Sequence, residues 1–516
     1  MHGNQSSVSW KTAALVLFVG APAVWHGYLT LARSHEVRKR RKRLEHRQRE
    51  YATRKLIERS ATLKAGDKAE ALEQTHEVHS HDASIEAATL NDVADEEERD
   101  MLMEAFASWK CLSRWHNALG FEWREQGAWE WLYWKLVWTP LNGKLFDDGG
   151  IPKDPAELAR TLPVETPNFI ALFGFDPTSA TCTIPETASY SSPPRSASSQ
   201  GMSDSWERLS STSQPFAEES SVSGTPSQAV ALSSTALSTK STENCLTFCW
   251  IGQSTTYVQL DGVGILTDPV FAHKTVDVFL APPRLAPPPC RLKDLMAWLQ
   301  VVIVSHGHAD HIHPADVREI GDSAQWVVPL GLGEFLRKHG VTRITELDWW
   351  QGTTLQVSLK GQDMPVELRV HATPAQHWTA RTPLDVNKSL WASFVVQGSR
   401  QSFFHAGDTG YSDGFFKAIG RIFGGVDVAF LPIGAYEPRW HLAPQHASPA
   451  DAVKIARDIK AKKAVGVHWR TWQLSSEHYL QPKQDLEIAK RHAGVDDDAF
   501  VTVIPGQVVQ VKPDEA

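Results

Sequence analysis

Cysteine and methionine are scarce in this chain, which contains five Cys and six Met among its 516 residues. So few cysteines in a chain of this length exclude a disulfide scaffold and any zinc module built from cysteine pairs. No two of them form a Cys-x-x-Cys motif, and their odd number is more typical of a reducing compartment. Cys245 and Cys249 lie four positions apart in a strand-like segment, and we assign them to the core.

The chain also lacks a strong excess of charge of one sign. Its 52 Lys and Arg stand against 60 Asp and Glu, which gives a net charge of −8, and 42% of its residues are hydrophobic. This is the composition of a globular protein, so a wholly disordered chain is excluded. At about 150 residues per domain, the length predicts roughly three structural units.

The positive charge is concentrated near the N-terminus. From Arg33 to Lys55, eleven Lys and Arg stand against three Glu, a local charge of +8, so the remainder of the chain sums to −16. Directly before this run, residues 12–32 are mostly apolar, and a stretch of about 20 such residues can span a bilayer. We predict that residues 1–34 form a helical membrane anchor. The positive flank would then keep the rest of the chain on the cytosolic or mitochondrial-matrix side.

Two other interpretations of the apolar segment stay open, a cleaved secretory signal peptide and a peripheral helix. The basic run itself could bind anionic lipid headgroups. Nucleic acid is the competing partner of the basic run, but a basic run next to a membrane span more often determines topology. A nuclease would need a basic surface around its site, and the net charge of −16 outside the run disfavours RNA as a substrate.

Composition divides the rest of the chain into four segments. Residues 35–100 are predicted to be a basic and charged linker, and from about 56 to 100 the poor apolar periodicity favours either a solvated helix or a linker. Residues 101–176 hold seven Trp between positions 109 and 138, which predicts a helical extension that packs on a neighbouring domain or faces a membrane interface. Residues 181–240 contain 18 Ser and 7 Thr, so 177–243 are predicted to be a disordered insertion. Residues 244–516 then form the domain with the candidate site.

The strongest chemical signal follows a short apolar run, Val301 to Val304, which predicts a buried strand. Next in the chain come His306, His308, Asp310 and His311, in the pattern His-x-His-x-Asp-His. Imidazole and carboxylate are ligands that divalent metal ions accept. A histidine-rich surface loop is the alternative, but this combination at this spacing favours a metal site.

Other predicted strands end in a potential ligand in the same way. Asp268 follows one apolar run, Asp408 lies just beyond a second, and His468 ends a third. His377 lies between two such strands. Because ligands gathered at strand ends have a rigid backing, they suit a preorganised site.

With these residues in place, the chain resembles the metallo-β-lactamase superfamily and, more narrowly, the N-acyl-phosphatidylethanolamine-hydrolysing phospholipase D family. The resemblance covers about residues 244 to 505. Two residues depart from the family pattern, Gln253, where His is usual, and His313, where an acidic residue is frequent. The blocks that carry the narrower resemblance are Trp250-Ile251-Gly252, Pro374-Ala375-Gln376-His377-Trp378, Asn387-Lys388-Ser389-Leu390-Trp391, Pro432 to Trp440, Gln445-His446 and Val467-His468-Trp469.

The resemblance implies an α+β fold, an αββα sandwich of two mixed β-sheets with helices outside. It also implies two zinc ions and a substrate-side residue, His446, which with Asp310 would take part in catalysis. A homodimer is implied by the resemblance alone. The implied ligands are His306, His308 and His377 for one ion, Asp310, His311 and His468 for the other, and Asp408 as the bridge between them.

The ligand chemistry is consistent with such a centre. Two adjacent cations lower the pKa of a water molecule between them and stabilise the oxygens of a phosphodiester during in-line attack. No serine or cysteine nucleophile is then required. The ligand types alone do not separate zinc from iron or manganese.

We therefore predict a membrane-associated zinc phosphodiesterase of phospholipase D type. It would convert N-acylphosphatidylethanolamine to an N-acylethanolamine and phosphatidic acid. The alternatives are another hydrolase of the same superfamily, such as a lactonase, a thioesterase or a nuclease, and a non-catalytic membrane adaptor. An adaptor would be expected to have lost ligands, whereas all seven implied positions are filled.

Overall fold

The computed structural model describes residues 35–36, 38–55, 94–111, 114–116, 130, 133–141, 149–173, 245–275, 282–359, 362–382 and 384–513. The predicted apolar anchor and the Ser/Thr-rich insertion both lie outside these residues. Within them, no helix has the length and apolar character needed to cross a bilayer.

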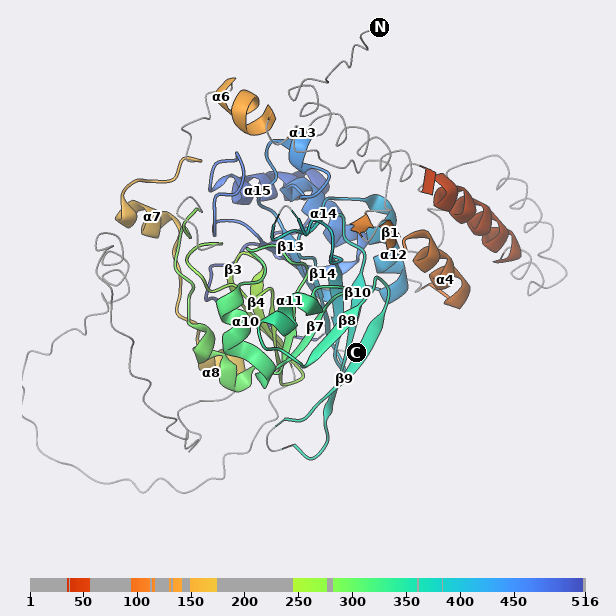
Figure 1. The fold of residues 1–516 in the computed structure, drawn as a ribbon, viewed down its shortest axis with the longest axis horizontal. Helices are drawn as coiled ribbons and strands as arrows, with labels where there is room; N and C mark the ends of the chain where they lie inside the picture. The colour runs from red at the N-terminus through yellow and green to blue at the C-terminus, as the bar shows by residue number, and fades with distance from the viewer. Residues whose placement is uncertain are drawn as a thin grey trace, which may run out of the picture. The chain divides into compact units, whose positions relative to one another are not determined.

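Two seven-stranded sheets form the centre of the molecule (Figure 1). The first sheet has the strand order β15-β14-β13-β12-β11-β10-β9, and the second has the order β16-β3-β4-β5-β6-β7-β8. Their bounds are β3 Leu246–Gly252, β4 Thr255–Leu260, β5 Val263–Thr267, β6 Val301–Ile303, β7 Gln325–Pro329, β8 Ile344–Leu347, β9 Gly352–Val357, β10 Val366–Thr373, β11 Ser393–Gln397, β12 Ser402–His405, β13 Val426–Pro432, β14 Ala461–Val467, β15 Phe500–Val501 and β16 Val508–Val511.

Both sheets are mixed, as the sequence predicts. In the first sheet β9 to β12 pair antiparallel and β12 to β15 pair parallel. In the second, β16, β3, β4 and β5 pair antiparallel and β5 to β8 pair parallel. Parallel strands place their carboxyl ends at one edge of a sheet, where α/β folds usually bind ligands. Strands β5, β6, β12 and β14 lie in these parallel parts and precede most of the candidate ligands, whereas His377 follows β10, which pairs antiparallel with both neighbours.

Helices cover the outer faces of the sheets, so the predicted αββα layering is present. Helix α14 packs on β13 and β14, whereas α8 packs on β3 and β16 and α11 on β8. The α-helices are α4 Glu96–Ala105, α6 Thr139–Leu141, α7 Pro155–Thr161, α8 Phe169–Phe173, α10 Pro314–Ile320, α11 Gly333–Lys338, α12 Asp413–Phe423, α13 Arg439–Leu442, α14 Pro449–Asp458 and α15 Gln481–Ala493.

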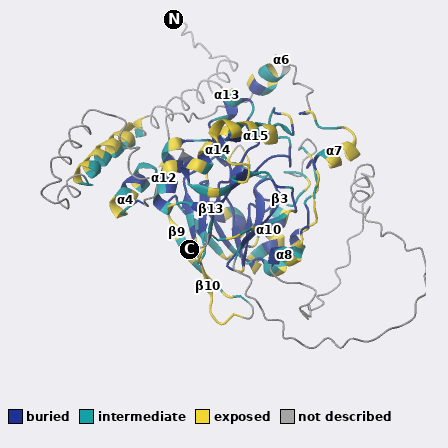
Figure 2. Ribbon diagram, turned by 180° about the vertical axis from the view of Figure 1, so that it is seen from behind, coloured by how far each residue is buried: buried dark blue, intermediate teal, exposed yellow. Residues whose placement is uncertain are grey.

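The main core lies between the two sheets, and strand β3 shows why both of its faces are apolar. Phe248 and Trp250 point into the space between the sheets, where the Phe248 ring lies 5.1 Å from that of Phe430 on β13. Cys249 and Ile251 point the other way, into a second apolar cluster. Successive residues of a strand face opposite sides, so a strand covered on both sides is apolar throughout. Figure 2 shows the burial concentrated in these strands.

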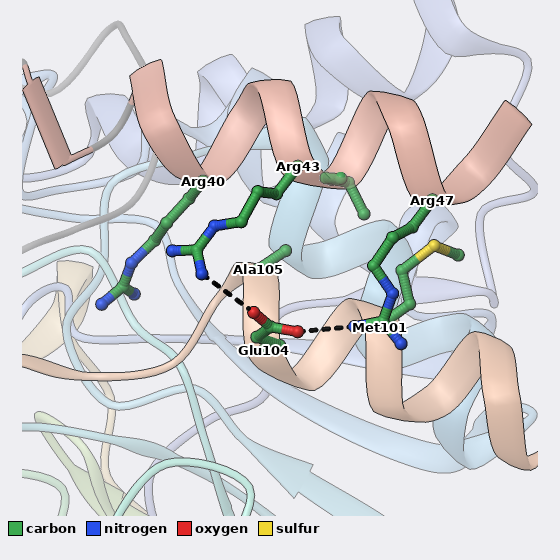
Figure 3. Close-up of a pocket in the computed structure, with 7 residues that line it drawn as sticks. Arg40, Arg43, Arg47, Met101, Glu104 and Ala105 are labelled. Carbon is green, nitrogen blue, oxygen red and sulfur yellow. Dashed lines mark hydrogen bonds and ion pairs between the residues drawn. The ribbon is translucent and has the colours of Figure 1, made fainter. Parts of the chain in front are cut away.

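Residues 38–55 are helical and contact α4 through charged side chains (Figure 3). The Glu104 carboxylate on α4 accepts hydrogen bonds from Arg43 and Arg47. Tyr51 donates to Asp95, the N-cap residue of α4, at 2.8 Å. The segment predicted as a charged linker therefore contains a helix with a defined partner.

Within its described residues, the segment 101–176 predicted as a helical extension contains two short strands as well as helices. Residues Trp109–Cys111 (β1) and Arg114–His116 (β2) form an antiparallel two-stranded sheet. A π-helix follows at Trp134–Trp138. Trp134 is buried and its ring lies 5.1 Å from His441, so at least this tryptophan packs against the domain with the candidate site.

Candidate metal centre

The His306–His311 loop joins β6 to α10, and its backbone is fixed from several sides. The Ser305 N–H donates to Asp268 Oδ1 at 2.7 Å, and the Gly307 N–H donates to Thr379 Oγ1 at 3.0 Å. One guanidinium nitrogen of Arg381 donates to the carbonyls of Gly307 and Ile312, at 3.1 and 3.0 Å. Arg381 therefore bridges the two sides of the loop.

The remaining candidate ligands come from the other sheet. His377 follows β10, Asp408 follows β12, and His468 directly follows β14. His468 has a φ of 63°, a left-handed conformation that is uncommon for residues other than glycine. His446 lies on the loop after α13, and its ring lies 5.1 Å from that of His377.

Three imidazoles and one carboxylate form the first ligand group, which comprises His306, His308, His377 and Asp408. His306 Nε2 lies 2.8 Å from His308 Nδ1, which lies 3.2 Å from His377 Nε2. Asp408 Oδ2 lies 3.7 Å from His377 Nε2. The four donor atoms thus surround one point.

The second ligand group comprises Asp310, His311, Asp408 and His468. Asp408 Oδ2 lies 3.2 Å from His311 Nε2, and Asp408 Oδ1 lies 2.9 Å from His468 Nε2. Asp310 Oδ2 lies 3.5 Å from His468 Nε2. Asp408 belongs to both groups, so the structure brings together all seven residues predicted as ligands, in the predicted division.

The hydrogen bonds on the outer side of the rings indicate that these residues suit cations. His377 Nδ1 lies 2.9 Å from the Gln445 carbonyl, and His311 Nδ1 lies 2.7 Å from Asp268 Oδ2. In the neutral form of each ring, both acceptors hold the proton on Nδ1, so the inward-facing Nε2 is the nitrogen that can bind a cation. Converging lone pairs and carboxylate oxygens repel one another unless a cation lies among them, so the donor set fits a divalent metal ion.

Asp268 lies behind the ligands rather than among them, although its position at a strand end grouped it with potential ligands. It is fully buried and accepts hydrogen bonds from the backbone and hydroxyl of Ser305. His405 Nε2 also lies 3.0 Å from its Oδ2. Burial opposes ionisation, but His405 and His311 lower the pKa of Asp268 to about 2. It is therefore a charged orienting group for His311.

Burial keeps the imidazoles of the first ligand group neutral. It lowers the pKa of His308 to about 4 and that of His377 to about 3, and it holds the pKa of His306 well below its ordinary value. His446, beside this group, has its pKa lowered to about 3 by the same cause. Neutral imidazole is the form that binds metal ions.

The second ligand group is dominated by its carboxylates. Burial opposes protonation of His311 and His468, but Asp408 and Asp310 outweigh it, raising the pKa of His468 to about 9 and that of His311 well above its ordinary value. The cluster of buried carboxylates thus attracts positive charge, which bound cations would supply.

Of the two residues that depart from the family pattern, His313 lies outside the ligand groups and Gln253 lies against one of them. His313 is the N-cap of α10, where its side chain accepts from the Ala315 N–H. Gln253 lies against the second ligand group, with its Nε2 2.7 Å from Asp310 Oδ2. Gln253 is not among the seven predicted ligands, and in the sequence only the preceding Trp250-Ile251-Gly252 block and the departure from the family pattern drew attention to it. Nothing in the local sequence marked Thr379 or Arg381.

Comparisons with known proteins agree with this geometry. A family model described as the beta-lactamase superfamily domain matches residues 264–469. A Saccharomyces cerevisiae protein named N-acyl-phosphatidylethanolamine-hydrolyzing phospholipase D, mitochondrial, is 38% identical over 255 residues, which make up 49% of this chain and 53% of that protein. This chain therefore spans about half the length of the yeast relative.

A Caenorhabditis elegans protein named N-acyl-phosphatidylethanolamine-hydrolyzing phospholipase D 1 is 35% identical over 277 residues, which make up 52% of this chain and 76% of that protein. Among solved structures, a possible metal-dependent hydrolase from Veillonella parvula is similar with a TM-score of 0.41 and 16% identity. The similarity covers 52% of this chain and 100% of that one.

Proposed function

This chain belongs to the N-acyl-phosphatidylethanolamine-hydrolysing phospholipase D family, and from that premise we propose that it is a zinc phosphodiesterase acting on N-acylphosphatidylethanolamine. Its products would be an N-acylethanolamine and phosphatidic acid. The observation that carries the proposal is the pair of ligand groups that share Asp408. The broader class, a metal-dependent hydrolase, follows from the family itself.

We assign one zinc ion to each ligand group, with Asp408 as the bridging residue. When bound, such a pair supplies a hydroxide nucleophile near neutral pH and stabilises the negative oxygens of a phosphodiester. Asp268 holds His311 with its Nε2 toward the centre, and the Gln445 carbonyl does the same for His377. The protein thus presents lone pairs in a fixed arrangement, which reduces the reorganisation needed during the reaction.

His446 and Asp310 are the proposed catalytic residues. His446 Nδ1 lies 3.9 Å from Asp408 Oδ2, and this ring nitrogen has no hydrogen-bond partner among the described residues. A neutral imidazole in this position can accept or donate a proton beside the reacting phosphate. Of the seven ligands, Asp310 and His308 are the two that are not fully buried. We therefore place the approach of the phosphodiester on their side.

We propose that the protein associates with a membrane through its N-terminal part. On the helix of residues 38–55, Arg40, Arg43 and Arg47 line the contact with α4 (Figure 3). Arg38, Lys39, Lys42 and Arg49 are exposed and make no ion pair within the described part of the chain. At 100° per residue, Arg38, Lys42 and Arg49 share a face opposite to Arg47. This exposed face is available to anionic lipid headgroups.

The apolar residues 12–32 directly precede this helix in the sequence, and we retain them as the proposed anchor. The yeast relative is named a mitochondrial protein. We therefore propose that the protein lies on a mitochondrial or other intracellular membrane, with the metal centre on the cytosolic or matrix side. This location agrees with the proposed lipid substrate.

The test is product analysis by mass spectrometry on the full chain in detergent. Metal-dependent release of N-acylethanolamine and phosphatidic acid from N-acylphosphatidylethanolamine is expected, with a loss of activity of about 100-fold or more in Asp310→Asn, which removes a metal ligand. Asp363→Asn is the matched control, because Asp363 is an exposed carboxylate outside both ligand groups. If the protein hydrolysed only a lactone, a thioester or RNA tested alongside, the metal centre would still be supported, but N-acylphosphatidylethanolamine would be wrong as the substrate.

A further inference from the structure

Gln253 lies in the turn between β3 and β4, and its backbone is held at three points. Its N–H donates to Thr471 Oγ1 at 2.6 Å, and its carbonyl accepts from Trp250 Nε1 and from the His468 N–H, each at 2.9 Å. The residue is 1% exposed and has a φ of 51°. A non-glycine residue in this left-handed conformation carries a backbone cost, and such residues concentrate at functional sites.

The side chain of Gln253 reaches two members of the second ligand group. Its Nε2 lies 2.7 Å from Asp310 Oδ2 and 2.8 Å from His468 Nε2. Within the group itself, the distances from His468 Nε2 to Asp408 Oδ1 and to His311 Nε2 are 2.9 and 3.2 Å. The terminal amide of Gln253 is therefore as close to these donor atoms as they are to one another.

A primary amide can present either of two chemistries at this point. A half-turn about its terminal carbon–carbon bond exchanges the NH2, a donor, with the carbonyl oxygen, a ligand for hard and borderline cations. With the NH2 turned inward, Gln253 can donate to Asp310. With its amide oxygen turned inward, that oxygen and the Asp310 carboxylate repel each other unless a cation lies between them.

We propose that Gln253 is a fifth ligand of the second ligand group and offers its amide oxygen to the cation held by Asp310, His311, Asp408 and His468. The three backbone hydrogen bonds place this amide before a cation arrives, so little entropy is lost when it binds. In metal-free protein the NH2 turns inward and donates to Asp310 Oδ2.

Zinc is usually four-coordinate in protein sites. A group with five protein donors, including oxygens of Asp310, Asp408 and Gln253, also accommodates ions that accept five or six ligands, such as Fe²⁺, Mn²⁺ or Co²⁺. We therefore expect both positions to bind zinc, with the second ligand group the less selective for it.

The inference rests on the proposed function only in requiring two bound cations. The experiment is a Co²⁺ titration of chelator-treated full-length protein, followed by visible absorption and by competition with a fluorescent chelator. In the wild type, two equivalents should bind, the second with the weaker absorption of five- or six-coordinate Co²⁺. In Gln253→Leu the dissociation constant of the second equivalent should rise about 10- to 100-fold, and its absorption should intensify as a ligand is lost. The first equivalent should be unchanged.

Gln253→Glu separates a ligand from a hydrogen-bond donor. A carboxylate oxygen replaces the amide oxygen as a ligand, so the second equivalent should bind at least as tightly as in the wild type. If Gln253 only donated to Asp310, the new carboxylate would repel it, and Gln253→Glu would bind more weakly than Gln253→Leu. That order would overturn the assignment.

Gln259→Leu is the matched control, since Gln259 lies on β4 outside both ligand groups, and circular dichroism checks the fold of each variant. Two equivalents with unchanged constants and spectra in Gln253→Leu would overturn this inference alone. A single equivalent in the wild type would overturn the two-cation proposal as well, so the two failures are distinguishable.

Discussion

Carboxylates contact His311 on opposite sides of its ring. Its Nε2 lies 3.2 Å from Asp408 Oδ2, and its Nδ1 lies 2.7 Å from Asp268 Oδ2. The outer contact decides which nitrogen carries the proton and therefore which one is free to bind a cation. At the scale of single residues, such outer partners determine the chemistry of the ligands.

Replacement of Asp268 by Asn should weaken the second ligand group without removing a ligand. The amide can offer its NH2 to His311 Nδ1 and so favour the wrong tautomer, and it no longer balances the charge of the centre. We expect metal affinity and kcat/KM to fall about 10- to 100-fold, measured by chelator competition and product release.

Asp427→Asn serves as the control for Asp268→Asn. Asp427 is also a buried carboxylate, but it accepts from Ser402 and pairs with Lys462, outside both ligand groups. Unchanged metal affinity in Asp268→Asn would refute the orienting role.

Asp316 on α10 predicts a pH dependence of stability. Burial raises its pKa to about 6, although the Phe271 N–H hydrogen bond partly opposes the shift. Because the folded protein holds this proton more tightly than the unfolded chain, the stabilisation is complete below about pH 4 and is lost as the pH rises through about 6.

In Asp316→Asn this titration is absent. The free energy of unfolding of the variant should therefore rise relative to the wild type by up to about 3 kcal/mol between pH 4 and pH 7. Urea unfolding at both pH values measures it, with Asp363→Asn as the control for loss of a carboxylate. A difference between variant and wild type that is independent of pH would contradict the assignment.

At the scale of elements, the helix of residues 38–55 and α4 are joined mainly by charge. Glu104 accepts from Arg43 and Arg47 (Figure 3), and Lys55 pairs with Asp95. Because these side chains are about half exposed, each pair contributes at most about 1 kcal/mol and is screened by salt. The contact is therefore a weak and salt-sensitive one.

Glu104→Gln should loosen this contact. We expect amide hydrogen exchange in residues 38–55 to accelerate up to about fivefold per lost ion pair, and high salt should have the same effect on the wild type. The matched control is Glu45→Gln, since Glu45 pairs only with Arg41 of the same helix among the contacts described. Equal acceleration in both variants would show that the contact with α4 does not depend on Glu104.

At the scale of the whole molecule, the metal centre joins the two sheets. The His306–His311 loop follows β6 of one sheet, whereas Asp408 and His468 follow β12 and β14 of the other. A cation bound to both ligand groups therefore links the halves of the sandwich and stabilises the folded state by mass action.

Removal of metal should lower the melting temperature. Ligand at 100 times its dissociation constant stabilises a folded protein by about 2.7 kcal/mol, so chelation should lower Tm by several degrees and added zinc should restore it. Calorimetry with metal analysis measures both. Magnesium should not restore Tm, because the donor set is rich in imidazole. An unchanged Tm in metal-free protein would contradict the assignment of these residues as ligands.

The sequence by itself determined the family, the two mixed sheets and the seven candidate ligands. The candidate ligands are marked locally, because apolar runs of strand length end in His or Asp and the His-x-His-x-Asp-His pattern lies within six residues, whereas the two mixed sheets were implied by the family resemblance. The N-terminal anchor and the insertion stay predictions, since both lie outside the described residues.

Only the tertiary structure decided which residues surround the ligands. Gln253 reaches His468 across 215 positions of sequence, and Arg381 reaches Gly307 across 74. The role of Asp268 as an acceptor behind His311, and the strands β1 and β2 within the Trp-rich extension, were decided in the same way. Hydrogen-bond partners of this kind are set by how two sheets pack, and no periodicity or local motif records that packing.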